Sequence, residues 1–213
     1  AGPDAQPARL GAENVVAQFR GRTGDMTVLI EAATPRLQID MSEERTLAIA
    51  MQRATANARI YDGTWRIDGA FESGTLRDPA LPGTVTTIAG QWEASPLDNE
   101  GPLIQVRSGE ALLTAQDPPE GERLLFNPMR LANVDATVRD GAIEAHGDIV
   151  LDNDGRQLAA FTAAHDISEG AGATRVNAPN VVFDETLQPY DLTERARGMV
   201  ENVRGPAELV ADI

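Results

Sequence analysis

The sequence contains no cysteine and no lysine, and only two of its 213 residues are histidine. Without cysteine the chain cannot form disulfides, use a thiol nucleophile or bind a metal through thiolates. Its 18 basic residues, all arginine, face 33 acidic residues, which gives a formal net charge of -15. This balance argues against nucleic-acid binding, which needs clustered basic side chains. It also argues against a basic helix that docks on anionic lipid headgroups.

Long apolar runs are absent as well, because no stretch approaches the roughly 20 apolar residues that a membrane-spanning helix needs. Residues 1–7 have neither the basic nor the apolar region of a signal peptide. Residues 207–213 still follow an alternating pattern where the sequence stops. We therefore expect a segment of a larger protein whose targeting and anchoring parts lie outside these 213 residues.

Motifs that carry catalysis or bind metals are also missing. His146 and His165 each stand alone, without the neighbouring ligands of a metal site, and are expected to face solvent. Residues 152–155 resemble part of a calcium loop, but the positions of its first and last ligands hold Val150 and Phe161. No glycine-rich phosphate loop and no Gly-x-Ser-x-Gly elbow occurs. We expect no catalytic residues, no metal ligands and no cofactor.

What the sequence does contain is alternation of apolar and polar residues with period two. This pattern is typical of strands with one apolar and one polar face. The clearest runs are residues 26–32, 36–41, 47–51, 64–71 and 143–151. The pattern predicts about a dozen strands and an all-β fold.

Turn-forming residues separate these runs. Asp62-Gly63, Asp140-Gly141 and Asp154-Gly155 match type I′ hairpin turns, which need positive φ. Proline cannot join a central ladder, so the proline-rich patches at 79–82, 96–102 and 118–119 are interpreted as longer loops.

The middle loops suggest a weak boundary in the chain near residues 96–128. Residues 1–213 are nevertheless treated as a single β-rich segment. One short helix is expected near 190–201, where Asp191 or Thr193 is a suitable cap after Pro189. Its buried stripe would comprise Leu192, Ala196, Met199, Val200 and Val203. The short run 13–19 is ambiguous and is interpreted as a strand.

Two architectures fit strands with one apolar face. A sandwich of two sheets needs bulky side chains that interdigitate across a core about 10 Å thick, whereas aromatic residues make up only 4% of this chain. A single curved sheet would instead leave its apolar face to be covered by a ligand. Composition alone leaves both open. In either case Trp65 and Trp92, the two tryptophans, are expected to pack against the apolar face.

The C-terminal part carries a family resemblance. Residues 181–192 (Val-Val-Phe-Asp-Glu-Thr-Leu-Gln-Pro-Tyr-Asp-Leu) are followed by 200–205 (Val-Glu-Asn-Val-Arg-Gly) and then by a new strand. Upstream, 131–136 leads through an Asp-Gly turn into the glycine-containing strand 141–151. This arrangement resembles the C-terminal region of the YdbH family of AsmA-like proteins, related in architecture to TamB. It is carried mainly by residues 131–213.

The resemblance implies a long envelope protein that is anchored in the inner membrane and crosses the periplasm. Its extended, curved antiparallel sheet would form an open hydrophobic groove, along which phospholipid moves between the inner and outer membranes. Membrane contact would occur through parts outside this segment. An older label of the family, dicarboxylate transport, does not suit an acidic chain without a basic cluster. The expected partner is phospholipid, with no nucleic acid and no enzymatic activity.

On this interpretation the apolar sides of the strands form a floor for acyl chains, because each methylene removed from water contributes about 0.8 kcal/mol. The candidate groove residues are Val28, Ile30, Ile39, Met41, Ile49, Met51, Trp65, Ile67, Phe71, Ile143, Ile149 and Leu151. Ordinary core packing explains any single one of them, so the hypothesis concerns the whole stripe. The alternative function is a structural or protein-binding β-sandwich domain of the cell envelope without lipid transfer.

Overall fold

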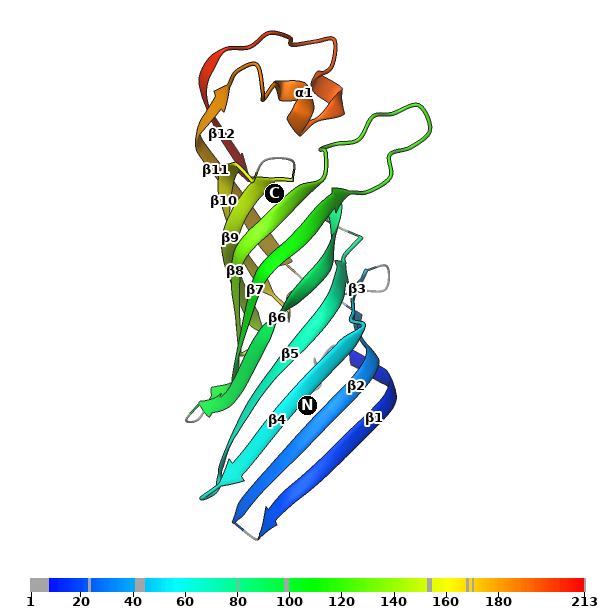
Figure 1. The fold of residues 1–213 in the computed structure, drawn as a ribbon, viewed down its shortest axis with the longest axis vertical. Helices are drawn as coiled ribbons and strands as arrows, with labels where there is room; N and C mark the ends of the chain where they lie inside the picture. Colours follow the sequence, from blue (N-terminus) through cyan, green and yellow to red (C-terminus); the bar gives the residue numbers. More distant parts are fainter. Residues whose placement is uncertain are drawn as a thin grey trace.

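The computed structural model describes residues 8–22, 24–40, 45–79, 81–97, 100–152, 155–167, 169 and 171–212. These residues form one antiparallel sheet of twelve strands (Figure 1). The all-β prediction is therefore confirmed. Within the described ranges the substantial contacts of each strand are with its neighbours in the sheet, so the strands do not divide into the two packed sheets of a sandwich.

The strands follow one another along the sheet almost in chain order. Their bounds are β1 (Ala8–Arg22), β2 (Asp25–Asp40), β3 (Thr46–Ala50), β4 (Arg53–Tyr61), β5 (Thr64–Arg77), β6 (Gly83–Leu97), β7 (Glu100–Ala115), β8 (Met129–Arg139), β9 (Ala142–Leu151), β10 (Gln157–Asp166), β11 (Ala171–Phe183) and β12 (Gly205–Asp212). The short strands β3 and β4 share one position, because both pair with β2 on one side and with β5 on the other. The ambiguous run 13–19 lies in β1, as predicted.

Two of the predicted hairpin turns have the expected geometry. Asp62 and Gly63 have φ of 47° and 76°, and Asp140 and Gly141 have φ of 48° and 79°. Positive φ at both central residues is the requirement of a type I′ turn, whose twist matches that of the flanking strands. The third predicted turn falls partly on Asp154, which is outside the described residues.

The loop predicted over residues 96–102 is wrong. Pro96 lies in β6 and Pro102 lies in β7, and the two residues are paired partners close to the end of the β6–β7 hairpin. A ladder position near a strand end tolerates proline, because few backbone hydrogen bonds remain to be made there. The sheet therefore continues across the weak boundary that the sequence indicated near residues 96–128.

The single helix predicted near 190–201 is shorter than expected. It consists of α1 (Pro189–Leu192) and the 3-10 turn η1 (Glu194–Ala196). Gln188 and Asp191 form a capping box at the start of α1. Ala196 is buried as predicted, and Leu192 and Val203 pack against a cluster of buried apolar residues. Met199 and Val200, however, are 76% and 44% exposed, so the prediction is wrong for these two members of the stripe.

A line of β-bulges crosses the sheet about halfway along the strands. Five non-glycine residues with φ between 46° and 53° mark it: Asn14, Thr34, Ser73, Thr87 and Asn133. They lie close together from strand to strand, since Gly74 pairs with Ile88 beside Ser73 and Thr87, and the Thr34 N–H donates to the Gln52 carbonyl between β3 and β4. Bulges bend a strand and increase its twist. The line therefore bends the sheet from β1 to β8 along one direction.

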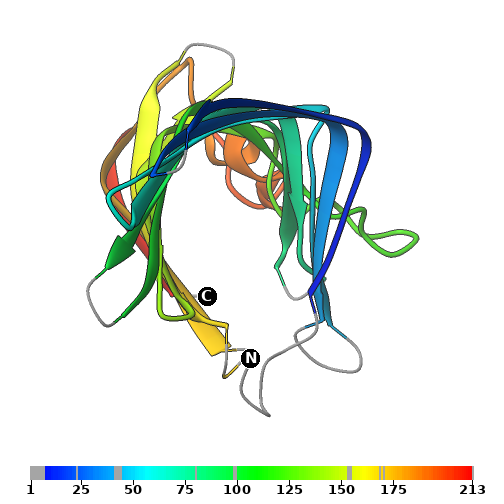
Figure 2. The ribbon, with the colours of Figure 1, turned by 90° about the horizontal axis from the view of Figure 1, so that it is seen from below.

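The bent sheet has an open, C-shaped cross-section when seen along the long axis of the molecule (Figure 2). The strands run obliquely across this curve, so β1 lies towards one end of the long axis and β12 towards the other (Figure 1). We call the rim that holds the β1–β2, β4–β5 and β8–β9 turns the hairpin rim.

Residues 184–204, which include α1 and η1, form a cap on the inner side of the curve near its C-terminal end (Figure 2). Leu187 of the cap is 1% exposed and belongs to a hydrophobic cluster with Ile149, Leu151 and Phe183. The Gln188 side chain joins the beginning of the cap to its end. Its Nε2 donates to the Val203 carbonyl and its Oε1 accepts from the Val203 N–H, both at 3.0 Å.

The long β7–β8 connection holds the cap from the other side. Asn127 Nδ2 donates to the carbonyls of Tyr190 and Asp191 at 3.1 and 2.9 Å. Arg123 donates to the carbonyls of Glu194 and Arg197 at 3.1 and 2.7 Å. These bonds satisfy carbonyls at the ends of short helical turns, and they tie the cap to the β7–β8 connection.

Candidate functional site

The face of the sheet that points to the inner side of the curve is apolar. Strand β9 identifies it, because its alternate residues Ile143, Ile149 and Leu151 lie on one face, and the last two contact the cap cluster. Residues paired across antiparallel strands share a face. Following the pairs outward from β9 therefore traces this inner face across the sheet.

Two rows of apolar residues cross eight strand positions on this face. The row nearer the hairpin rim is Phe19, Val28, Ala58, Ile67, Ala94, Ile104, Val138 and Ile143. The row on the other side of the bulges is Leu10, Leu37, Ile49, Leu76, Val85, Leu113, Met129 and Leu151. Neither row is interrupted by a polar residue.

The bulges keep both rows on the same face. In β2 the inner residues before Thr34 have even numbers, as in Val28 and Ile30, whereas Leu37 and Ile39 after it have odd numbers. One extra residue in a bulge reverses the phase of the alternation. Without it, one of the two rows would point to the outer face.

The structure brings most of the predicted groove residues together on the inner face. They are Val28, Ile30, Ile39, Ile49, Trp65, Ile67, Phe71, Ile143, Ile149 and Leu151. Met51 lies between β3 and β4, where its N–H donates to the Pro35 carbonyl, and is not part of a strand. Met41 is outside the described residues.

Sequence reasoning missed several members of the two rows, among them Ile104, Val138, Leu76, Val85 and Leu113. The sequence signal that could have found them is a change from even-numbered to odd-numbered apolar positions within one strand, as between Val106 and Leu113 of β7. Such a change interrupts a search for strict alternation, although it is what a bulge requires.

Aromatic rings on this face lie close to glycines of the neighbouring strand. A side chain at Gly69 would meet the Trp92 ring at 2.4 Å, and one at Gly147 would meet the Phe161 ring at 2.8 Å. Trp92 shares the face of Ile30 and Ala56, because Gly69 is its partner. Both glycines thus give a neighbouring aromatic ring room to lie close to the backbone.

Burial differs between the two ends of the inner face. Ile149 and Leu151, beneath the cap, are 8% and 6% exposed and belong to the hydrophobic cluster that includes Leu187. Ile67, Ile104 and Val138, away from the cap, are only half-buried. Among the described residues no element packs over this part of the face. Apart from the buried Val28, Phe71 and Ala94, it is an apolar surface that keeps contact with solvent.

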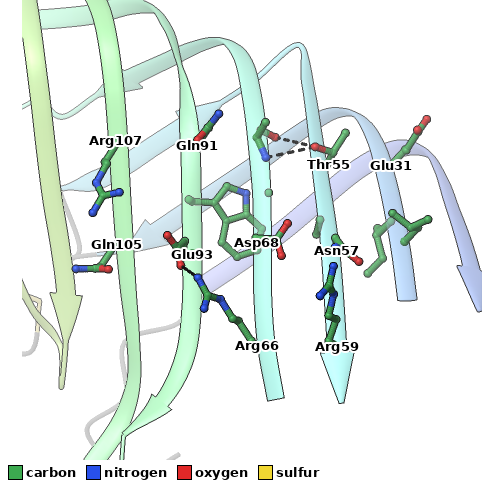
Figure 3. A pocket seen from close by; sticks show the side chains of 16 residues that line it. Glu31, Thr55, Asn57, Arg59, Arg66, Asp68, Gln91, Glu93, Gln105 and Arg107 are labelled. Carbon is green, nitrogen blue, oxygen red and sulfur yellow. Dashed lines mark hydrogen bonds and ion pairs between the residues drawn. The ribbon is translucent and has the colours of Figure 1, made fainter. Parts of the chain in front are cut away.

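The outer face is polar and charged. A hollow of about 610 Å³ lies on this face. It is lined by Arg59, Arg66 and Arg107 beside Asp68 and Glu93 (Figure 3). Arg66 forms an ion pair with Glu93 there. The hollow lies on the opposite side of the sheet from the apolar rows and is therefore not the predicted groove.

The two histidines lie on different faces. His146 is exposed on the outer face, and the residue opposite it on β8 is Asp135. His165 pairs with Ile143 and is half-buried at the end of an apolar row, so the expectation that it faces solvent holds only in part. In the ranges that the structure describes, no three acidic or histidine side chains gather as metal ligands. No helix of the described chain has the length and apolar character to cross a membrane.

Comparisons with protein-family models, with characterised proteins and with solved structures found no match to this chain. The functional interpretation consequently depends on the geometry described above, together with the resemblance noted in the sequence.

Proposed function

We propose that the inner face of the curved sheet binds the acyl chains of phospholipids and lets them move along the molecule. The observation that carries this proposal is the pair of uninterrupted apolar rows. Outside the cap region their side chains are half-buried or exposed, except for the buried Val28 and Ala94. An exposed apolar surface of this extent is unfavourable in water, and in soluble proteins such surfaces mark sites of binding.

The dimensions of the rows suit a lipid tail. Eight strand positions are separated by seven spacings of about 4.8 Å, so a row spans roughly 34 Å. One acyl chain extends roughly 15 Å, half of a hydrocarbon core about 30 Å thick. Each methylene of a bound tail that is kept from water contributes about 0.8 kcal/mol. The apolar residues further along the row in both directions are similar, so the tail would bind there about equally well.

The open cross-section suits the headgroup. Because the curve does not close (Figure 2), a charged headgroup can stay in water while the tail lies on the inner face. This avoids the cost of burying an unpaired charge. Movement along the rows would then be diffusion between sites of nearly equal energy, and its direction would depend on where phospholipid is supplied.

The resemblance to YdbH-like proteins supports the same proposal and adds a location. In this view the segment is a periplasmic part of a protein anchored in the inner membrane, and it carries phospholipid between the two membranes. The alternative is a structural or protein-binding envelope domain without lipid transfer. It is favoured by the free edges of β1 and β12, each of which has a strand neighbour on only one side within the described sheet.

Site-specific photocrosslinking tests the proposal. Val106 and Gln105 are adjacent residues of β7, both half-buried, and point to the inner and outer face respectively. A photoreactive phenylalanine analogue at Val106 should form adducts with the mass of phospholipid, detected by mass spectrometry of the purified protein. The analogue at Gln105 is the matched control and should form none. Equal labelling of both positions, or none at Val106, would contradict the proposal.

A further inference from the structure

One corner of the hairpin rim exposes apolar and aromatic side chains. It is formed by the β1–β2 and β4–β5 turns, which lie near the β1 end of the sheet (Figure 1). Phe19, Ile60 and Tyr61 are 68%, 41% and 46% exposed there. Phe19 and Ile60 also line a shallow hollow of about 420 Å³ together with Met26.

Three arginines without partners surround this corner. Arg20, Arg22 and Arg59 are exposed, and none forms an ion pair or hydrogen bond with a residue of the described chain. Arg20 pairs with Thr27, which in turn pairs with Arg59, so two of these guanidiniums belong to one row across three neighbouring strands.

The corner therefore differs in charge from the rest of the protein. Its arginines outnumber Asp25 and Asp62, the acidic residues of the two turns, in a chain with a net charge of -15. The two kinds of side chain are also separated by face. Phe19 and Ile60 belong to the inner face, whereas Arg20 and Arg59 belong to the outer face, because neighbours in a strand point to opposite sides.

We propose that this corner docks on the surface of a bilayer that contains anionic phospholipid. Apolar and aromatic side chains would enter the boundary between headgroups and acyl chains, and the arginines would reach the phosphates. Like guanidiniums without carboxylate partners repel one another in the free protein, and a layer of negative headgroups relieves this repulsion. The proposal goes beyond lipid binding on the inner face, since docking does not require that face to carry a tail.

Flotation with vesicles tests the electrostatic part. The protein should float with vesicles of phosphatidylcholine mixed with phosphatidylglycerol, and much less with phosphatidylcholine alone. The double variant R20Q/R22Q should lower the partition coefficient roughly thirtyfold at low salt. The matched control is R36Q/R77Q, which removes the same charge from two exposed arginines that also lack a partner in the described chain but lie away from the corner.

A second pair of variants tests the apolar part. Phe19→Ser should weaken binding to the same vesicles roughly tenfold. Leu10→Ser is its control, because Leu10 lies on the same strand and the same face, is 80% exposed, and is at the end of β1 away from the corner. Both positions are too exposed on an edge strand for the substitutions to unfold the sheet.

The outcomes separate this proposal from its rivals. Equal losses in R20Q/R22Q and R36Q/R77Q would indicate a general charge effect and overturn it. Self-association through the free edge of β1, seen as dimers in analytical ultracentrifugation that Phe19→Ser abolishes without any vesicle binding, would also overturn it. If vesicle binding fails while photocrosslinking at Val106 still captures phospholipid, docking is wrong and the proposed function stands.

Discussion

Asn133 of β8 donates a hydrogen bond from its Nδ2 to Asp148 Oδ2 of β9 at 2.8 Å. Asn133 is the bulge residue of its strand, with φ of 51°. Its neighbour β9 keeps one phase of alternation throughout, from Ile143 to Leu151. The bond therefore links the strand that changes phase to the strand that does not, at the point where the apolar rows would otherwise diverge.

The first prediction concerns the bulge at Asn133. A left-handed backbone is costly for a β-branched residue, whereas glycine adopts it freely. Asn133→Val should lower the free energy of unfolding by about 2 kcal/mol more than Asn133→Gly. Urea denaturation measures both, and the glycine variant controls for the lost hydrogen bond to Asp148. Equal losses would mean that the backbone conformation at this position carries no strain.

A second prediction distinguishes the open part of the inner face from the part beneath the cap. Ile149→Asp buries an unpaired charge in the cluster under the cap and should cost about 3–5 kcal/mol. Ile67→Asp lies on the half-buried part, where water can reach the carboxylate, and should cost about 1 kcal/mol. Thermal denaturation followed by circular dichroism compares them. A similar large loss at Ile67 would indicate that this surface is a closed core.

The third prediction concerns Gln188, which is 7% exposed and bonds both backbone groups of Val203. Gln188→Ala would leave the part-buried N–H and carbonyl of Val203 without these partners, at a cost of about 1–3 kcal/mol each. The cap should then open without unfolding of the sheet, because residues 184–204 take no part in the pairing between strands. Hydrogen exchange should rise in residues 185–203 and stay low in β5–β7. Uniform acceleration across the chain would contradict a locally opening cap.

A fourth prediction follows from Asp184, at the start of the cap. Hydrogen bonds from the Thr186 hydroxyl and backbone, with smaller help from the Leu187 N–H and Arg156, hold the pKa of the Asp184 carboxyl below its ordinary value. Its stabilisation of the turn is fully present above the ordinary pKa of about 3.9 and is lost as pH falls through the lowered pKa.

Amide proton chemical shifts report this titration. Those of Thr186 and Leu187, whose N–H groups donate to Asp184 Oδ1 at 2.7 and 3.0 Å, should stay constant down to about pH 4 and move below it. Asp184→Asn keeps an acceptor oxygen but cannot titrate, so its shifts should not change over that range. Movement centred above pH 4 in the original protein would show that the carboxylate is not stabilised.

Much of the fold could be predicted from particular sequence patterns. Alternation over residues 26–32 and 64–71 predicted strands with one apolar face, and Asp62-Gly63 predicted a turn whose φ values the structure confirms. These features depend on residues close together in the chain. The prediction at Pro96 and Pro102 failed because a paired position near the end of a hairpin depends on the partner strand, which proline content does not reveal.

The candidate site was predictable in part for the same reason. Val28 and Ile67 belong to clean alternating runs, and the structure places both in one row. Val85 and Leu113 share the other row, but only after bulges at Thr87 and Gly109 have changed the phase of their strands. A bulge is specified by the ladder on both sides of a strand, so one strand read alone does not locate it.

The sequence by itself determined that this protein is built from antiparallel strands with an apolar and a polar side, because side-chain alternation and Asp-Gly turns act over a few residues. Only the tertiary structure decided that these strands form one bent sheet, and that the cap covers the apolar face near β9 to β11 and leaves residues such as Ile67, Ile104 and Val138 in contact with water. The physical reason is that bending and covering depend on pairings between residues far apart in the chain.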